Sequence, residues 1–151
     1  MFNVLVFSGA THKAFYQSPT VDNSKSALLR LSSKVQTIKA LNSSLREPET
    51  MLTDQVIFAV LLMCIIGNGE KVTAAEKRES RPLATAQDAQ FYASLEYEWR
   101  HMDALIELVK RKGGLHTIAL PGLAFAIASW VSIMMYQTDA RSITDKLSFQ
   151  V

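Results

Sequence analysis

Cysteine is nearly absent from this sequence. Cys64 is the only cysteine among 151 residues, so the chain can form no internal disulfide and no zinc site from several of its own cysteines. A single thiol inside an apolar run is expected to pack as a small, inert side chain. The cysteine usage therefore favours an intracellular compartment.

Apolar runs long enough to cross a membrane are also lacking. The unbroken run from Val56 to Ile66 would extend about 16 Å as a helix, roughly half of a bilayer core. The N-terminus has no cation ahead of its short apolar stretch and no small-x-small cleavage pattern, so no signal peptide is predicted. The charge-free stretch after Gly114 is broken by Pro121-Gly122, and the part from Gly122 to Tyr136 is short and contains serines. A buried helix is favoured there, and a membrane anchor formed by residues 120–136 is the alternative.

No catalytic motif is present. His12, His101 and His116 lie on separate segments, without a Gly-x-Ser-x-Gly elbow or a His-Glu-x-x-His helix. The segment Gly67 to Lys71 lacks the spacing of a phosphate-binding loop and is predicted to be a turn. Because no nucleophile has an adjacent base, we predict no enzymatic activity, no catalytic residue and no cofactor.

A complete metal site is not evident either. Glu98 and His101 have the Glu-x-x-His spacing that supplies half of a di-metal site in helix bundles. A full site needs a second such pair and two further glutamates. We interpret His101 as a hydrogen-bonded, partly buried histidine and keep metal binding as a minor alternative.

The positive charge is unevenly distributed. The whole chain has a formal charge of +2, yet residues 1–46 contain six Lys or Arg against one Asp, which gives +5 and leaves −3 for the remainder. Because no aromatic residues are interleaved with these cations, as a single-strand stacking surface would require, the segment is interpreted as a solvated helix face. Direct nucleic-acid binding is not expected.

The patterns that are present predict helices. Phe2 to Phe7 has the content of a short strand, but no later segment alternates in a way that could pair with it, so a helix through about Tyr16 is favoured. A second, amphipathic helix is predicted from about Asn23 or Ser24 to Leu45. A buried central helix is predicted to open at Thr53-Asp54-Gln55, to continue through the apolar run from Val56 to Ile66, and to end at Gly67-Asn68-Gly69. The apolar face of the second helix is formed by Leu28, Leu31, Val35, Ile38, Leu41 and Leu45. A last helix follows Gly122, with Leu123, Ile127, Trp130 and Met134 at helical spacing.

The longest predicted element runs from Thr85 to Leu115. Thr85 and Asp88 form a capping-box-like start, and Gly113-Gly114 form a C-cap after three cationic residues. One broad face of this helix is apolar: Phe91, Tyr92, Leu95, Trp99, Met102, Leu105, Ile106 and Val109. We therefore predict an all-α single domain of about five to six helices packed around a central helix at about residues 86–112. The domain spans residues 1–140, with a charged connection at 70–84 and a polar tail at 141–151.

Several short motifs in this region resemble a known family. Residues 101–105 (HMDAL) and 111–115 (RKGGL), which include His101, Leu105, Gly113 and Gly114, resemble a segment of the fungal-specific transcription-factor domain. That domain is the helical regulatory region of fungal binuclear zinc-cluster regulators. Residues 40–45, residues 52–61, the early helix and Trp130 are similar to further motifs of that domain, in the same order. Lys112 and Ala104 depart from the family pattern, and the connection from Gly69 to His101 is expanded.

The resemblance implies a non-catalytic regulatory or interaction domain. It implies a nuclear location, protein partners including a second copy of the chain, and an optional small apolar effector between helices. The cysteine-rich DNA-binding module of such regulators is not in this sequence, so the domain is expected to be partial. The five motif residues are interpreted as structural. This interpretation requires residues 88–112 to form one helix, with Trp99 and Leu105 buried.

Overall fold

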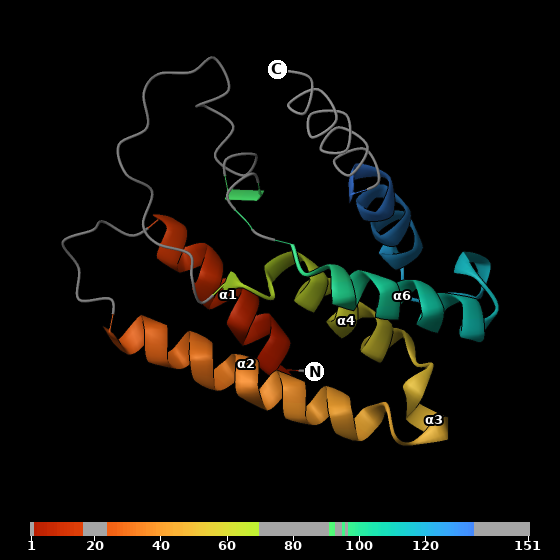
Figure 1. The fold of residues 1–151 in the computed structure, drawn as a ribbon, viewed down its shortest axis with the longest axis horizontal. Helices are drawn as coiled ribbons and strands as arrows, with labels where there is room; N and C mark the ends of the chain where they lie inside the picture. Colours follow the sequence, from red (N-terminus) through yellow and green to blue (C-terminus); the bar gives the residue numbers. More distant parts are fainter. Residues whose placement is uncertain (1, 17–23, 70–90, 93–94, 96, 135–151) are drawn as a thin grey trace, which may run out of the picture.

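The computed structural model describes residues 2–16, 24–69, 91–92, 95 and 97–134, and every regular segment within these ranges is helical (Figure 1). Within these ranges the labelled α-helices are α1 (Phe2–Tyr16), α2 (Ser24–Ser44), α3 (Pro48–Met51), α4 (Asp54–Ile66) and α6 (Trp99–Lys112). A 3₁₀ turn, η2 (Leu115–Thr117), follows α6, and residues 123–134 are again helical. The predicted all-α class is confirmed.

Helix α1 forms where local propensity alone would favour a strand. Val4, Phe7, Thr11 and Ala14 are buried and recur at three and four residues, which places them on one face of a helix. The hydroxyl of Thr11 is buried too, and it donates a hydrogen bond to the carbonyl of Phe7 at 2.8 Å. The helix that was predicted to end near Tyr16 is confirmed.

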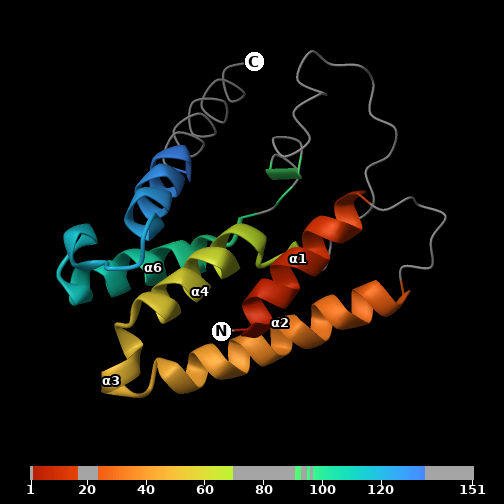
Figure 2. The ribbon, with the colours of Figure 1, turned by 180° about the vertical axis from the view of Figure 1, so that it is seen from behind.

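The centre of the fold is α4. Nine of its thirteen residues are buried, and the helix contacts α1, α2 and α6. Because α4 is apolar on all sides, it requires neighbours all round. The predicted start near Thr53 and stop at Gly67 are both confirmed. The views from front and back place α4 beside α6, with the α1–α2 pair on its other side (Figures 1 and 2).

The prediction of one helix from Thr85 to Leu115 is wrong. Residues 91 and 92 are helical, but Leu95, Tyr97 and Glu98 are not, and α6 begins only at Trp99. The capping start at Thr85 and Asp88 lies outside the described residues. Helix α6 is therefore about half as long as the sequence suggested, and α4 takes the central position assigned to residues 86–112.

A tertiary hydrogen bond accounts for the break. The backbone N–H of Glu98 donates to the carbonyl of Cys64 at 3.2 Å, so it satisfies an acceptor that the C-terminal end of α4 leaves unpaired. Glu98 has an extended backbone at the N-cap of α6. The favourable helix propensity of this segment is thus overridden by its docking onto α4.

Helix α2 has the predicted length but the opposite orientation. Its buried residues are Arg30, Ser33 and Thr37. Four residues of the predicted apolar face are all exposed: Leu28, Leu31, Val35 and Ile38. Only Leu41 and Leu45 pack partly against the core.

Two buried polar side chains of α2 donate hydrogen bonds that make this orientation possible. Thr37 donates to the carbonyl of Ser33 at 2.8 Å, and the guanidinium of Arg30 donates to the carbonyl of Gly69 at 2.7 Å. A buried polar side chain is tolerated when it has such partners. The small polar face of α2 therefore packs inward, and the leucine face is left to solvent.

Candidate functional site

The most unusual surface of the molecule is the outer face of α2. We define it by Leu28, Leu31, Val35 and Ile38, whose side chains are 67%, 51%, 42% and 38% exposed. Their spacing of three, four and three residues aligns them along one side of the helix. Both views place α2 at the edge of the molecule, where α1 crosses its other side (Figures 1 and 2). Contiguous exposed apolar side chains of this kind mark interaction surfaces more often than isolated ones do.

Cations border this outer face on one side. Lys25 and Lys39 are exposed, and their spacing of fourteen residues places them along one edge of α2, while the exposed Arg46 follows just after the helix ends at Ser44. Helix α2 contains no Asp or Glu. The surface is therefore an apolar line with a purely basic border.

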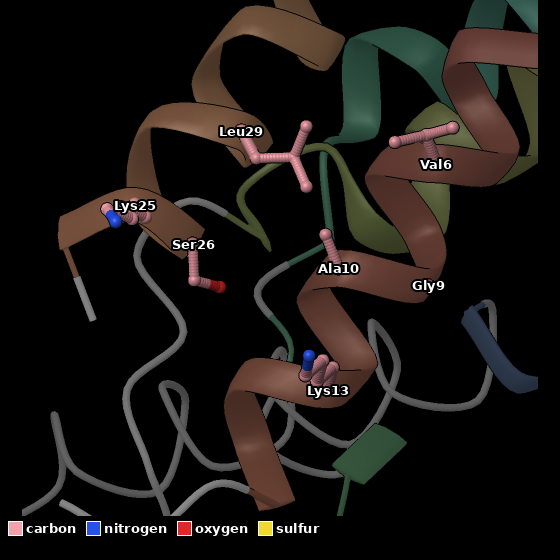
Figure 3. Close-up of a pocket in the computed structure, with 7 residues that line it drawn as sticks. All are labelled: Val6, Gly9, Ala10, Lys13, Lys25, Ser26 and Leu29. Atoms are coloured by element: carbon pink, nitrogen blue, oxygen red, sulfur yellow. The ribbon is translucent and has the colours of Figure 1, made fainter. Parts of the chain in front are cut away.

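A groove lies between α1 and α2 (Figure 3). It has a volume of about 520 Å³ and is open to solvent. Figure 3 shows Leu29 and Ser26 of α2 facing Val6 and Ala10 of α1 across it. Lys13 and Lys25 complete its lining with Gly9. A mainly apolar floor with two cations suits a small apolar molecule that ends in an anionic group.

His101 lies at the junction of α4 and α6. A Cβ atom on Gly67 would lie 3.6 Å from the Cδ2 of His101, so the ring rests against the end of α4. Burial lowers the pKa of His101, and Lys34 of α2 lowers it further, against the opposing effect of Glu98. The neutral imidazole is therefore favoured in the folded protein.

Cys64 is fully buried beneath the same junction. Burial, with a smaller contribution from Glu98, raises the pKa of its thiol to about 11. A thiol with so high a pKa is a poor nucleophile at neutral pH. The interpretation of Cys64 as an inert core side chain agrees with this environment.

The opposite end of the α4–α6 pair is held by a polar cluster that sequence reasoning missed. Asp54 accepts hydrogen bonds from the backbone N–H groups of Ala119 at 2.8 Å and Leu120 at 2.7 Å. Lys112 lies 3.2 Å from the other carboxylate oxygen of Asp54 and donates to the carbonyl of Leu52 at 2.8 Å. The acidic residue in the first turn of α4 was the only sequence signal, and it gave no indication of these distant partners.

The double glycine ends α6 as the sequence predicted. Gly113 and Gly114 have φ angles of 107° and 103°. The N–H of Gly114 donates to the carbonyl of Val109, and the N–H of Gly113 donates to that of Lys110. This pair of bonds defines a Schellman motif, which requires a left-handed residue after the helix. Leu115, which follows the glycine pair, is exposed at the start of η2.

The remaining motif residues lie in the core or beside it. Leu105 is completely buried on α6, whereas Trp130 is partly buried and contacts the rings of Tyr92 and Tyr97, with centroids 5.5 Å and 5.6 Å apart. The structure thus distributes His101, Leu105, Trp130 and the glycine pair along α6 and the following helix. It does not gather them into one pocket.

The three histidines are not brought together. His12 is on α1 and stacks near Phe91, with centroids 5.0 Å apart, while His116 is exposed in η2. Within the described ranges no group of three or more His, Cys, Asp or Glu side chains could hold a metal ion.

Residues 123–134 form the described part of the segment that was considered as a membrane anchor. Leu123, Ile127 and Met134 are buried, as their spacing predicted, and Phe125 is 79% exposed. Among the residues that the structure describes, no helix has both the length and the apolar character needed to cross a bilayer.

Comparison of the chain with protein-family models, with curated proteins and with solved structures found no match.

Proposed function

We propose that this chain is a non-catalytic regulatory domain that acts through contacts with other proteins in the nucleus, similar to the helical domain of fungal zinc-cluster transcription regulators. The single observation that carries the interaction role is the outer face of α2, where four apolar side chains point away from the core. The regulatory context rests on the sequence motifs alone. In this proposal the chain contacts other proteins and does not bind DNA directly.

The break before Trp99 removes one structural condition of the resemblance. The resemblance required an unbroken helix over residues 88–112, and residues 95, 97 and 98 are not helical. The burial of Leu105 and the glycine stop of α6 agree with the structural roles that the motifs implied. The exposure of the outer face of α2 does not depend on the resemblance, so it is the stronger support for the interaction role.

A small apolar effector belongs to the same proposal. The groove between α1 and α2 is the place we assign to it, because Val6, Ala10 and Leu29 offer apolar contact beside Lys13 and Lys25. A bound molecule there would touch both helices and so stabilise their pairing. A thermal shift with a medium-chain fatty acid, absent in a Lys13→Glu/Lys25→Glu variant, would support this site.

A tethering experiment tests the regulatory role. The whole chain is fused to an unrelated DNA-binding domain, placed upstream of a reporter gene in a fungal cell, and compared with the DNA-binding domain alone. We expect the fusion to change reporter output, and the Leu31→Gln/Val35→Gln variant to abolish that change. Phe125→Gln is the matched control, since it removes an exposed apolar side chain from a different helix. A helical, nuclear fusion that leaves the reporter unchanged would refute the proposal.

A further inference from the structure

We propose that the outer face of α2 binds an amphipathic helix of another protein, and that this helix carries acidic residues beside its apolar line. The inference rests on the proposed interaction role and adds the chemistry of the partner. Three observations carry it: the heptad spacing of the exposed side chains, the basic border, and the absence of any acidic residue in α2.

The spacing of the apolar line is that of a helix-pairing seam. Leu28, Leu31, Val35 and Ile38 alternate steps of three and four residues, and Asn42 continues the same alternation. In a two-helix pair these residues would occupy the a and d positions of successive heptads. The line from Leu28 to Asn42 extends about 21 Å, enough to contact a partner helix of about 14 residues.

Asn42 occupies an a position in this register, and it is exposed. A single asparagine in such a seam favours one alignment of the two helices, because other alignments would bury its amide without a partner. The seam therefore favours one register of the two helices and also offers apolar area for contact.

The positive charge beside the seam favours a partner helix that carries acidic residues. Lys25 and Lys39 occupy alternate e positions of α2, which flank the seam in a helix pair, and the exposed Arg46 lies just after the end of the helix. Acidic residues on the opposing helix would face these cations, which speeds association and excludes basic helices.

The same charge disfavours a second copy of the chain. Lys25 and Lys39 flank the seam, and α2 contains no anionic residue, so two α2 helices packed face to face would bring together charges of one sign only. The acidic partner relieves this repulsion and uses the same apolar seam. We therefore assign the face to a different protein.

A direct binding measurement tests this inference. The probe is a fluorescein-labelled synthetic peptide of about 20 residues with leucine at the a and d positions, one asparagine at an a position, and glutamate at the flanking positions. Binding to the full chain is followed by fluorescence anisotropy. A peptide with lysine in place of every glutamate, and a peptide with the sequence of residues 24–46, serve as comparison probes.

We expect the acidic peptide to bind and the two basic peptides not to bind. Leu31→Gln and the double variant Lys39→Glu/Arg46→Glu should each weaken binding by about tenfold or more, and high salt should weaken binding to the unaltered chain. Phe125→Gln should leave binding unchanged. All three variants change exposed residues, so circular dichroism and thermal melts should show that they fold as the unaltered chain does.

Three results would overturn the inference: no binding of the acidic peptide, equal binding to the Leu31→Gln variant, or a dimer of the chain that Leu31→Gln dissociates. The last result would show that a second copy covers the face. If the tethered chain still regulates the reporter through Leu31 and Val35 while the acidic peptide fails to bind, the proposed function stands and only the partner chemistry is wrong.

Discussion

Lys112, at the end of α6, lies with its Nζ 3.2 Å from the Oδ1 of Asp54, at the start of α4. The two residues are far apart in sequence, and together they close one end of the central helix pair. The same carboxylate receives the N–H groups of Ala119 and Leu120. One side chain thus fixes three segments, which makes it the clearest target for a stability test.

Replacing Asp54 with Asn should lower the free energy of unfolding by about 1–3 kcal/mol at neutral pH, because it weakens charge-assisted hydrogen bonds that are largely shielded from water. Burial tends to raise the pKa of Asp54, but the bonds from Leu120, Lys112 and Ala119 outweigh it and hold that pKa below the usual 3.8. The unfolded chain therefore takes up the proton first as the pH falls. The stabilisation is present above about pH 4 and is lost as the pH drops through the folded-state pKa.

Urea denaturation of the unaltered chain and of the Asp54→Asn variant, at pH 7 and near pH 3, measures this effect. The difference between their free energies of unfolding should be smaller at the lower pH. Glu107→Gln is the control, since its ion pair with Arg111 lies on the exposed side of α6 and should contribute little. An equal difference in the free energy of unfolding at both pH values would argue against the role of the charged carboxylate.

Gly69→Ala should destabilise the protein by about 1–3 kcal/mol through overpacking. A Cβ atom on Gly69 would lie 2.6 Å and 2.7 Å from the two γ atoms of Thr11. Thr11 is fully buried and branched at Cβ, so it has little freedom to move away. Gly9→Ala provides a matched comparison in α1, because nothing lies within 4 Å of the added atom.

Gly9→Ala should stabilise the protein by about 0.5–1 kcal/mol, since alanine loses less conformational entropy in a helix than glycine does. Thermal melts of the two variants should therefore shift in opposite directions. Equal shifts would show that the contact between Gly69 and Thr11 does not limit the packing of α1.

Gly113→Ala should cost about 1–2 kcal/mol, because an L side chain in the left-handed region clashes with the following carbonyl. Gly113 has a φ of 107°, and the added Cβ would lie 3.1 Å from Thr117 Cγ2. Gly113→Asn should cost less, since asparagine enters this region more readily. Denaturation midpoints of the two variants compare these costs, and an alanine variant as stable as the asparagine variant would contradict the Schellman assignment.

His101→Gln should flatten the pH dependence of stability on the acidic side of neutrality. Burial and Lys34 lower the pKa of His101 from the usual 6.5, although Glu98 opposes them. As the pH falls below 6.5, the unfolded chain therefore takes up a proton that the folded protein does not, and the unaltered protein loses stability. The glutamine variant lacks this loss.

The measurement compares the free energy of unfolding of both proteins from about pH 7.5 to about pH 5. As the pH falls, the free energy of unfolding should decrease less for the His101→Gln variant than for the unaltered protein. His116→Gln, at an exposed position in η2, should track the unaltered protein. A difference that stays constant with pH would show that the environment of His101 does not discriminate between its charge states.

Most of the helical elements could be predicted because local signals were consistent. Pro48 and the Gly67 turn mark real boundaries, and the glycine pair stops α6 in the conformation that its sequence predicted. The missed break before Trp99 has a different origin. Its cause is a hydrogen bond from Glu98 to Cys64, and no local pattern contains information about a partner so far along the chain.

The candidate site could be predicted only in part. Periodicity correctly placed Leu28, Leu31, Val35 and Ile38 on one face of α2, but the assumption that an apolar face must be buried gave it the wrong orientation. The signals that pointed the other way were Ser33, Thr37 and Arg30 on the opposite face, whose polar groups find partners within the fold.

The sequence by itself determined that the described chain is helical, where most of the helices begin and end, and which residues share a face. It could do so because capping, glycine stops and three-to-four-residue spacing act within a few residues. Only the tertiary structure decided which of those faces meet. That choice depends on hydrogen bonds and close contacts between distant residues, such as Arg30 with Gly69 and Asp54 with Leu120. These long-range contacts placed the polar side of α2 inside and left its leucines available to a partner.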